Sequence, residues 1–224
     1  EAAAISEKLL MSPEVTVNDK VLASTIYNSL GISCKSINDF SGAKDAYQRS
    51  IEIIEPLMES NPAVPEYAAS LANAFHNLAG VQAIRNADDA AIASHRRAIG
   101  LRLDHVRKYP GRLDFQMELA RCHISLGKTL NRSDAQNASR EMKRAITIAQ
   151  EVVEKAPRNA SHLNNLGMMY SIFGDQQRVS APAEAIRWYE KSIELRQQLA
   201  EDHPQNFQYQ AAIGSTLINL ASVK

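Results

Sequence analysis

The sequence has no excess of either charge, because its 25 lysine and arginine residues are matched by 25 aspartate and glutamate residues. A neutral chain has no overall field that would attract nucleic acid or anionic lipid. No apolar run approaches the roughly 18 residues of a membrane-spanning helix, and the start, EAAAISEKLL, lacks the basic and apolar segments of a signal peptide. We therefore expect a cytoplasmic protein whose partners are neither nucleic acid nor membrane.

Cysteine is scarce, and no catalytic constellation is apparent. Cys34 and Cys122 are the two cysteines of the chain, too few for a disulfide framework or a cysteine metal site. No Ser/His/Asp or Cys/His set can be assigned to a shared pocket. We therefore expect no enzyme activity, no cofactor and no metal. The chain also lacks an initiator methionine, so we expect it to be a fragment of a longer protein.

Proline gives the first sign of an internal repeat. Five of the 8 prolines recur at intervals of 47 to 49 residues: Pro13, Pro62, Pro110, Pro157 and Pro204. A small residue preceded by a large apolar one recurs at nearly the same interval: Gly31, Ala79, Gly127, Gly174 and Ala221. A large side chain lies fifteen residues before each of the later prolines: Tyr47, His95, Met142 and Tyr189. Features that keep one register over four units indicate a tandem repeat.

The spacing within each unit is that of helices. One apolar stripe steps by 4, 4 and 3 residues: Tyr67, Leu71, Phe75 and Leu78. Each unit therefore predicts two helices of roughly 20 residues each. Glycine costs about 1 kcal/mol in a helix relative to alanine, so its recurrence predicts close packing of two antiparallel helices. Ser133 and Ser180 are predicted N-caps, and Pro182 is a predicted first-turn residue.

One stretch, ISLGKTLNR at residues 124–132, contains the Gly-Lys-Thr of a phosphate-binding loop. That loop requires G-x-x-x-x-G-K-S/T after a strand, because the loop amides wrap the phosphates. Cys122 stands where the first glycine would be, and the stretch lies within a predicted helix. Gly127 occupies the small-residue position of the repeat. We therefore interpret it as a packing residue and predict no nucleotide site.

The order aromatic–x2–Leu–Gly, then Ala–x3–aromatic–x2–Ala/Ser, then Pro resembles the tetratricopeptide repeat (TPR) through nearly the whole chain. The unit is longer than the standard repeat of about 34 residues. Its length and the segment Tyr109–Gly127 resemble the TPR arrays attached to large bacterial serine/threonine protein kinases. The chain itself has no glycine-rich loop, HRD or DFG motif of a kinase domain. The resemblance implies an all-α, right-handed superhelical solenoid of antiparallel helix pairs.

The repeat register also predicts the organisation of the chain. Complete repeats are expected at about 14–62, 63–110, 111–157 and 158–204, as one array over residues 1–224. Residues 1–13 and 205–224 then form partial repeats, with further repeats expected beyond both ends. Exposed repeat ends of this kind would permit self-association.

Histidine and arginine supply candidates for function outside the repeat pattern. His95 and His123 take large-residue positions and are interpreted as packing residues, whereas His76 lies off that stripe. Residues 94–112 are basic: Arg96, Arg97, Arg102, Arg107, Lys108 and Arg112. This segment fits a patch for an acidic or phosphorylated partner. It also fits the solvated outer face of a helix, which we favour.

TPR proteins bind partners in a concave groove lined by the first helix of each pair, and the resemblance assigns groove positions by register. Asn77 and Arg121 alone match the five-residue set with which some TPR proteins hold a C-terminal carboxylate, so we reject that activity. Ile124 is also assigned to the groove surface. We predict a polar site for a protein or peptide partner at six residues: Asn73, His76, Asn77, Arg121, Lys128 and Asn131.

Two alternatives to this partner site remain open. The six residues could be ordinary polar residues of a solenoid surface. The chain could also be a regulatory or self-associating segment of a larger signalling enzyme, such as a bacterial protein kinase.

Overall fold

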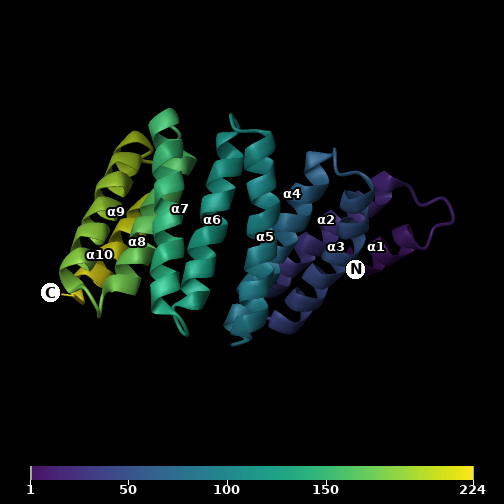
Figure 1. Cartoon of the computed structure of the whole chain (residues 1–224), viewed down its shortest axis with the longest axis horizontal. Coiled ribbons are helices and arrows are strands. Elements are labelled where there is room, and N and C mark those ends of the chain that lie inside the picture. The colour runs from purple at the N-terminus through teal and green to yellow at the C-terminus, as the bar shows by residue number, and fades with distance from the viewer. Residues whose placement is uncertain (1, 224) are drawn as a thin grey trace. The chain divides into compact units, whose positions relative to one another are not determined.

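The computed structural model describes residues 2–223, and every regular element in that range is an α-helix (Figure 1). We call alternate helices first helices: α2 (Val17–Ser36), α4 (Pro65–Ile84), α6 (Leu113–Leu130), α8 (Ala160–Gln177) and α10 (Phe207–Ala221). The others are second helices: α1 (Ala2–Leu10), α3 (Phe40–Ser60), α5 (Asp88–Lys108), α7 (Ala135–Lys155) and α9 (Pro182–Asp202). The predicted all-α array of helix pairs is confirmed.

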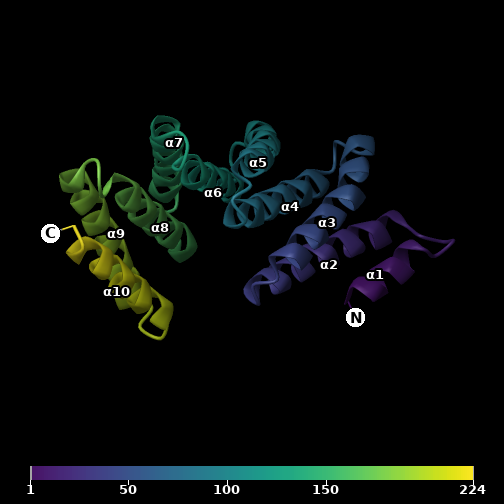
Figure 2. The same cartoon turned by 90° about the horizontal axis from the view of Figure 1, so that it is seen from below.

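The chain divides into two compact units, Glu1–Pro110 and Gly111–Lys224. Unit 1 contains α1 to α5 and unit 2 contains α6 to α10, and Figure 2 shows the helices following one another within each. In each unit every helix packs against the next, and neighbouring first helices also contact each other: α2 with α4, α6 with α8, and α8 with α10. The first helices of a unit therefore share one face, which we call the first-helix face.

The recurring small residues lie where paired helices approach most closely. A Cβ added to Gly31 would lie 2.5 Å from the Tyr47 ring, and one added to Gly174 would lie 2.7 Å from the Tyr189 ring. At Gly127 the corresponding distance to Met142 Cγ is 2.5 Å. These distances leave no room for a methyl group, which explains why glycine recurs at this register despite its cost in a helix.

The two predicted N-caps are wrong by one residue. Asp134, and not Ser133, caps α7, because its Oδ1 accepts a hydrogen bond of 3.0 Å from the Asn137 amide. Ala181 precedes α9 without a side-chain cap. Pro182 lies in the first turn of α9 as predicted. The backbone N–H that proline lacks would have no partner within the helix at this position.

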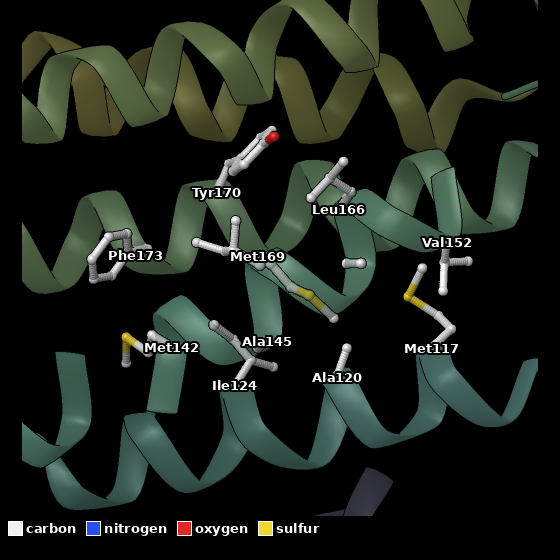
Figure 3. Close-up of a cluster of buried hydrophobic side chains, with 12 residues drawn as sticks. Met117, Ala120, Ile124, Met142, Ala145, Val152, Leu166, Met169, Tyr170 and Phe173 are labelled. Carbon is white, nitrogen blue, oxygen red and sulfur yellow. The ribbon is translucent and has the colours of Figure 1, made fainter. Parts of the chain in front are cut away.

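Unit 2 has an apolar core built from consecutive helices. Figure 3 shows side chains of α6, α7 and α8 converging in one cluster. Its members are Met117, Ala120, Ile124, Met142, Ala145, Ile146, Ala149, Val152, Leu166, Met169, Tyr170 and Phe173. Trp188, the single tryptophan of the chain, packs against this cluster from α9. Its ring lies 5.5 Å from Tyr170 and 5.2 Å from Phe173, between ring centres.

The α4–α5 pair of unit 1 differs from the other pairs at its large-residue position, which is occupied by histidine. The rings of His76 and His95 lie 5.6 Å apart in an edge-to-face arrangement. Ser94 donates a hydrogen bond of 2.8 Å to Gln82 Oε1. His95 is 2% exposed, and burial lowers its pKa to about 3, with His76 adding a smaller effect of the same sign. This helix pair therefore buries a neutral imidazole where the other pairs bury tyrosine or methionine.

Candidate interaction surface

The six predicted site residues all lie on first helices or at their ends. Three belong to α4 in unit 1: Asn73, His76 and Asn77. Three belong to unit 2: Arg121 and Lys128 on α6, and Asn131 as its C-cap. Each unit therefore presents its own part of the first-helix face, and we describe the two parts separately.

In unit 1 the asparagines of the first-helix face already bond to neighbouring helices. Asn77 Nδ2 donates a hydrogen bond of 3.0 Å to Asn28 Oδ1, and this bond joins α4 to α2. Asn73 Oδ1 accepts a bond of 2.5 Å from Arg102 on α5. The bond between Asn28 and Asn77 is not predicted by the repeat pattern alone. Their separation of 49 residues is close to one repeat length, which is the signal that would have suggested it.

In unit 2 the first-helix face carries charge. Arg121 pairs with Glu118 one turn earlier on α6, at 2.9 Å, and Lys128 is exposed. The prediction that Ile124 lies on this face is wrong, because its side chain is 2% exposed and belongs to the apolar core. The register of a standard TPR fails at this position because an apolar side chain gains more from core packing than from water.

First helices in unit 2 are linked in the same manner as α2 and α4. Asn219 of α10 donates a hydrogen bond of 3.0 Å to Asp175 of α8, and Asp175 also accepts a bond of 2.7 Å from Tyr189. Arg178 donates a longer bond of 3.5 Å to Ser222 Oγ. Asn77 and Asn219 each lie two residues before the small residue of their repeat. At this position an asparagine therefore donates a hydrogen bond to the neighbouring first helix in both units.

The basic segment at residues 94–112 is largely neutralised. Arg97 forms an ion pair with Glu55 at 2.6 Å and lies over the Phe75 ring. Arg107 pairs with Asp104, and in unit 2 Arg112 pairs with Asp114. Arg102 is buried. These contacts support the interpretation of an ordinary charged helix surface and not a dedicated anion site.

The histidines in large-residue positions are buried, as the register predicted. His95 packs on α4, and His123 is 7% exposed with its Nδ1 2.6 Å from Glu141 Oε2. His76 is half-buried, next to His95, so it belongs to the α4–α5 contact. The Gly127-Lys128-Thr129 stretch lies inside α6, where the Thr129 hydroxyl donates to the Ser125 carbonyl.

An open hollow of about 550 Å³ lies in unit 2 where α9 ends and α10 begins. Its wall includes the rings of His203 and Tyr209, whose centres are 6.1 Å apart. In the part of the chain that the structure describes, no group of three or more His, Cys, Asp or Glu side chains is placed to hold a metal ion. No helix among residues 2–223 is long and apolar enough to cross a membrane.

Comparison with known proteins agrees with this geometry. Residues 159–205, which contain α8 and α9, match the family model of the tetratricopeptide repeat. The crystal structure of BtubC (BKLC) from P. vanneervenii is similar over 99% of this chain and 80% of that chain, at 16% identity and a TM-score of 0.67. The apo form of RapI is similar over 98% of this chain and 75% of that chain, at 15% identity and a TM-score of 0.53.

At these identities the solved structures show the fold alone. A search of curated proteins finds no match to the chain. The fold defines a helical-repeat protein, the class in which consecutive helix pairs stack on one another. Within this class the chain is similar to the tetratricopeptide repeat family, whose model residues 159–205 match.

Proposed function

We propose that the chain is a non-catalytic scaffold that binds a protein or peptide partner in the groove lined by its first helices. The observation that supports this proposal is the first-helix face itself. Neighbouring first helices contact each other within each unit, so their outward positions form a continuous surface. Repeat arrays offer extended surfaces of this kind to partners, and the TPR fold is typically non-catalytic. The proposal includes a cytoplasmic location, with both cysteines free as they are under reducing conditions.

Affinity capture tests this proposal. The double variant Asn77→Ala and Arg121→Glu is expected to lose a partner that the parent chain holds, because it removes one polar contact from the first-helix face of each unit. The bound proteins would be identified by mass spectrometry of material captured from a cell lysate. Circular dichroism should show unchanged helix content, since Arg121 is part-exposed and Asn77 makes one side-chain bond across helices.

The matched control is Arg187→Glu, which reverses an exposed charge on a second helix. It should capture the same partner as the parent chain. Equal capture by the parent and the double variant would contradict the proposal that the first-helix face binds the partner.

A second candidate function is self-association as a regulatory segment of a larger signalling enzyme, such as a bacterial serine/threonine protein kinase. The face of α10 favours it. Tyr27, His123 and Tyr170 share one register position and are at most 7% exposed, whereas Leu217 at that position of α10 is 48% exposed. Ile218 beside it is 72% exposed. At the Leu217 position the described residues therefore cover α10 less than they cover α2, α6 and α8.

If a second copy of the chain covers this face, Leu217→Glu is expected to abolish self-association. The parent chain would then form dimers or larger species as its concentration rises, because burial of apolar side chains drives association. Sedimentation velocity over a range of concentrations measures the effect. Gln208→Glu, which adds the same charge to another exposed position of α10, should associate like the parent. A monomeric parent at all concentrations contradicts this candidate.

A further inference from the structure

Arg196 buries a positive charge inside unit 2. It belongs to the second helix α9, which packs against both α8 and α10 (Figure 2), and it is 7% exposed. Its Nη1 donates hydrogen bonds of 3.0 Å to the Ala212 carbonyl and 2.5 Å to Thr216 Oγ1, both on α10. Arg196 forms no ion pair with any residue that the structure describes. Buried charges are normally paired, because an uncompensated charge loses its hydration without a return.

Two of the three guanidinium nitrogens of Arg196 have no acceptor among residues 2–223. Nε is shielded from solvent and makes no hydrogen bond. Nη2 makes none either, but it is not shielded in this way. Nε and Nη2 form one edge of the guanidinium, and the two parallel N–H groups of such an edge fit two oxygens of a carboxylate or phosphate. The edge can therefore hold one oxyanion that arrives at Nη2.

Gly167 on α8 leaves space beside this edge. A Cβ added to Gly167 would lie 3.6 Å from Arg196 Nε and 3.5 Å from its Cγ. These are ordinary van der Waals distances, so a methyl group would fit there and would cover Nε. The same register position, seven residues before the recurring small residue, holds alanine in α4 and α6: Ala72 and Ala120. The glycine of α8 therefore leaves room for an oxygen to reach Nε after a small movement of the guanidinium.

The α4–α5 pair shows which group occupies the corresponding edge in unit 1. Arg102 has the same register position in α5, eight residues before the recurring proline, and it is also buried. Its Nη2 donates to Asn73 Oδ1 on α4. The residue of α8 that corresponds to Asn73 is Met168, six residues before the recurring small residue. A thioether sulfur is a weak acceptor, so Arg196 lacks the first-helix acceptor that Arg102 uses.

We propose that unit 2 binds one small oxyanion, a phosphate or a carboxylate group, on the Nε–Nη2 edge of Arg196 beside Gly167. The anion supplies a counter-charge to the buried guanidinium. Because Nη1 is bonded to Ala212 and Thr216, the anion also strengthens the contact of α10 with α8 and α9, and the folded state of unit 2 becomes more stable when it is bound. The inference goes beyond the proposed partner groove and does not depend on it, since Arg196 belongs to a second helix.

Inorganic phosphate and acetate are the probes. Isothermal titration calorimetry of residues 1–224 at constant ionic strength is expected to show a single phosphate site. The Nε–H resonance of Arg196, identified in ¹H–¹⁵N NMR spectra by its loss in Arg196→Lys, should shift with the same dissociation constant, because the anion accepts a hydrogen bond from this group. Tighter binding of phosphate than of acetate assigns the site to a phosphate group. Equal or tighter binding of acetate assigns it to a carboxylate.

Three substitutions test the location of the site. Arg196→Lys keeps the charge but has no second N–H beside it, and the affinity for the anion is expected to fall at least about tenfold. Gly167→Ala covers Nε and should weaken binding by a similar factor, while the fold is kept because the methyl group meets only ordinary contacts. Met168→Asn supplies the acceptor that Arg102 has in α4, so it should compete with the anion and also weaken binding.

The matched control is Arg187→Gln, which removes an exposed positive charge from the same helix and should bind phosphate like the parent. A parent chain that binds neither probe overturns the inference. Binding that is unchanged in Arg196→Lys and Gly167→Ala also overturns it, as does an equal loss in Arg187→Gln and Arg196→Lys, which would indicate non-specific attraction. The double variant Asn77→Ala and Arg121→Glu should bind phosphate like the parent. Failure of the anion site and failure of the partner groove are therefore separate results.

Discussion

Gly174→Ala is expected to destabilise unit 2 by about 1 to 3 kcal/mol, the usual effect of overpacking a close contact. The new methyl carbon would lie 2.7 Å from the ring of Tyr189, a side chain that is fully buried and whose hydroxyl donates to Asp175. The ring is fully buried and its hydroxyl is fixed by that hydrogen bond, so it cannot move into solvent. Urea unfolding followed by the fluorescence of Trp188 measures the effect, because this tryptophan packs in the same unit.

Gly214→Ala is the matched control for this prediction. Gly214 lies within α10, and a methyl group added there meets nothing within 4 Å. Alanine is the better helix former, so this variant should be more stable than the parent by up to about 1 kcal/mol. The two substitutions are chemically identical and are expected to have opposite signs. A stabilising Gly174→Ala would contradict the close packing of α8 on α9.

The α4–α5 pair suggests how the loss at Gly174 can be repaired. There the same two register positions are occupied by Ala79 and His95, and both side chains are buried. Tyr189→His combined with Gly174→Ala recreates that pair in unit 2. The double variant should be more stable than the sum of the two single effects predicts. The changes in the free energy of unfolding are not additive for residues in contact. Additive effects would show that the two positions are independent.

His95→Leu is expected to make the chain less sensitive to acid. The pKa of His95 is lowered from 6.5 to about 3 by burial and, to a smaller extent, by His76. A histidine with a lowered pKa stabilises the folded state fully above its unfolded pKa, and this contribution is lost as pH falls from about 6.5 toward 3. At pH 4.5 the parent chain should have lost about 2 to 3 kcal/mol through this residue alone.

Circular dichroism during urea unfolding at pH 7.5 and pH 4.5 measures this difference in the parent and in His95→Leu. Leucine fills a similar volume and has no proton to gain, so the free energy of unfolding should change less between the two pH values. Other groups titrate in both chains, and the comparison cancels their effects. An equal pH dependence in the two chains would show that protonation of His95 does not limit stability.

The helix pairs were predictable because their signals are local and repeated. A glycine or alanine fixed in register with a large side chain indicates the face on which each pair packs, and the structure places Gly31 on Tyr47 and Gly127 on Met142. The N-caps were less predictable, since Ser133 and Asp134 are adjacent and either side chain can cap a helix. In the structure Asp134 is the N-cap, because its carboxylate accepts a hydrogen bond from the third amide of α7.

The candidate site was harder to predict because it depends on which first helices lie side by side. The register placed Asn77 on a surface, but the bond to Asn28 involves a helix almost 50 residues away. It also placed Ile124 on that surface, where packing against α7 and α8 overrode the standard pattern. Asp175 accepts hydrogen bonds from both Tyr189 and Asn219. These donors lie on two other helices, so the sequence alone does not identify Asp175 as a shared acceptor.

The glycine–tyrosine and alanine–histidine contacts limit how such an array can be rearranged. A second helix that carries tyrosine can pack closely on a first helix that has glycine at the facing position, as α9 does on α8. Placed beside α4, it would bring a tyrosine ring against Ala79. Exchange of α5 with a tyrosine-bearing second helix is therefore expected to fail, whereas exchange of intact helix pairs keeps each small residue with its large neighbour. The helix pair is therefore the part of this protein that keeps the contact between small and large residue when repeats are duplicated, deleted or recombined.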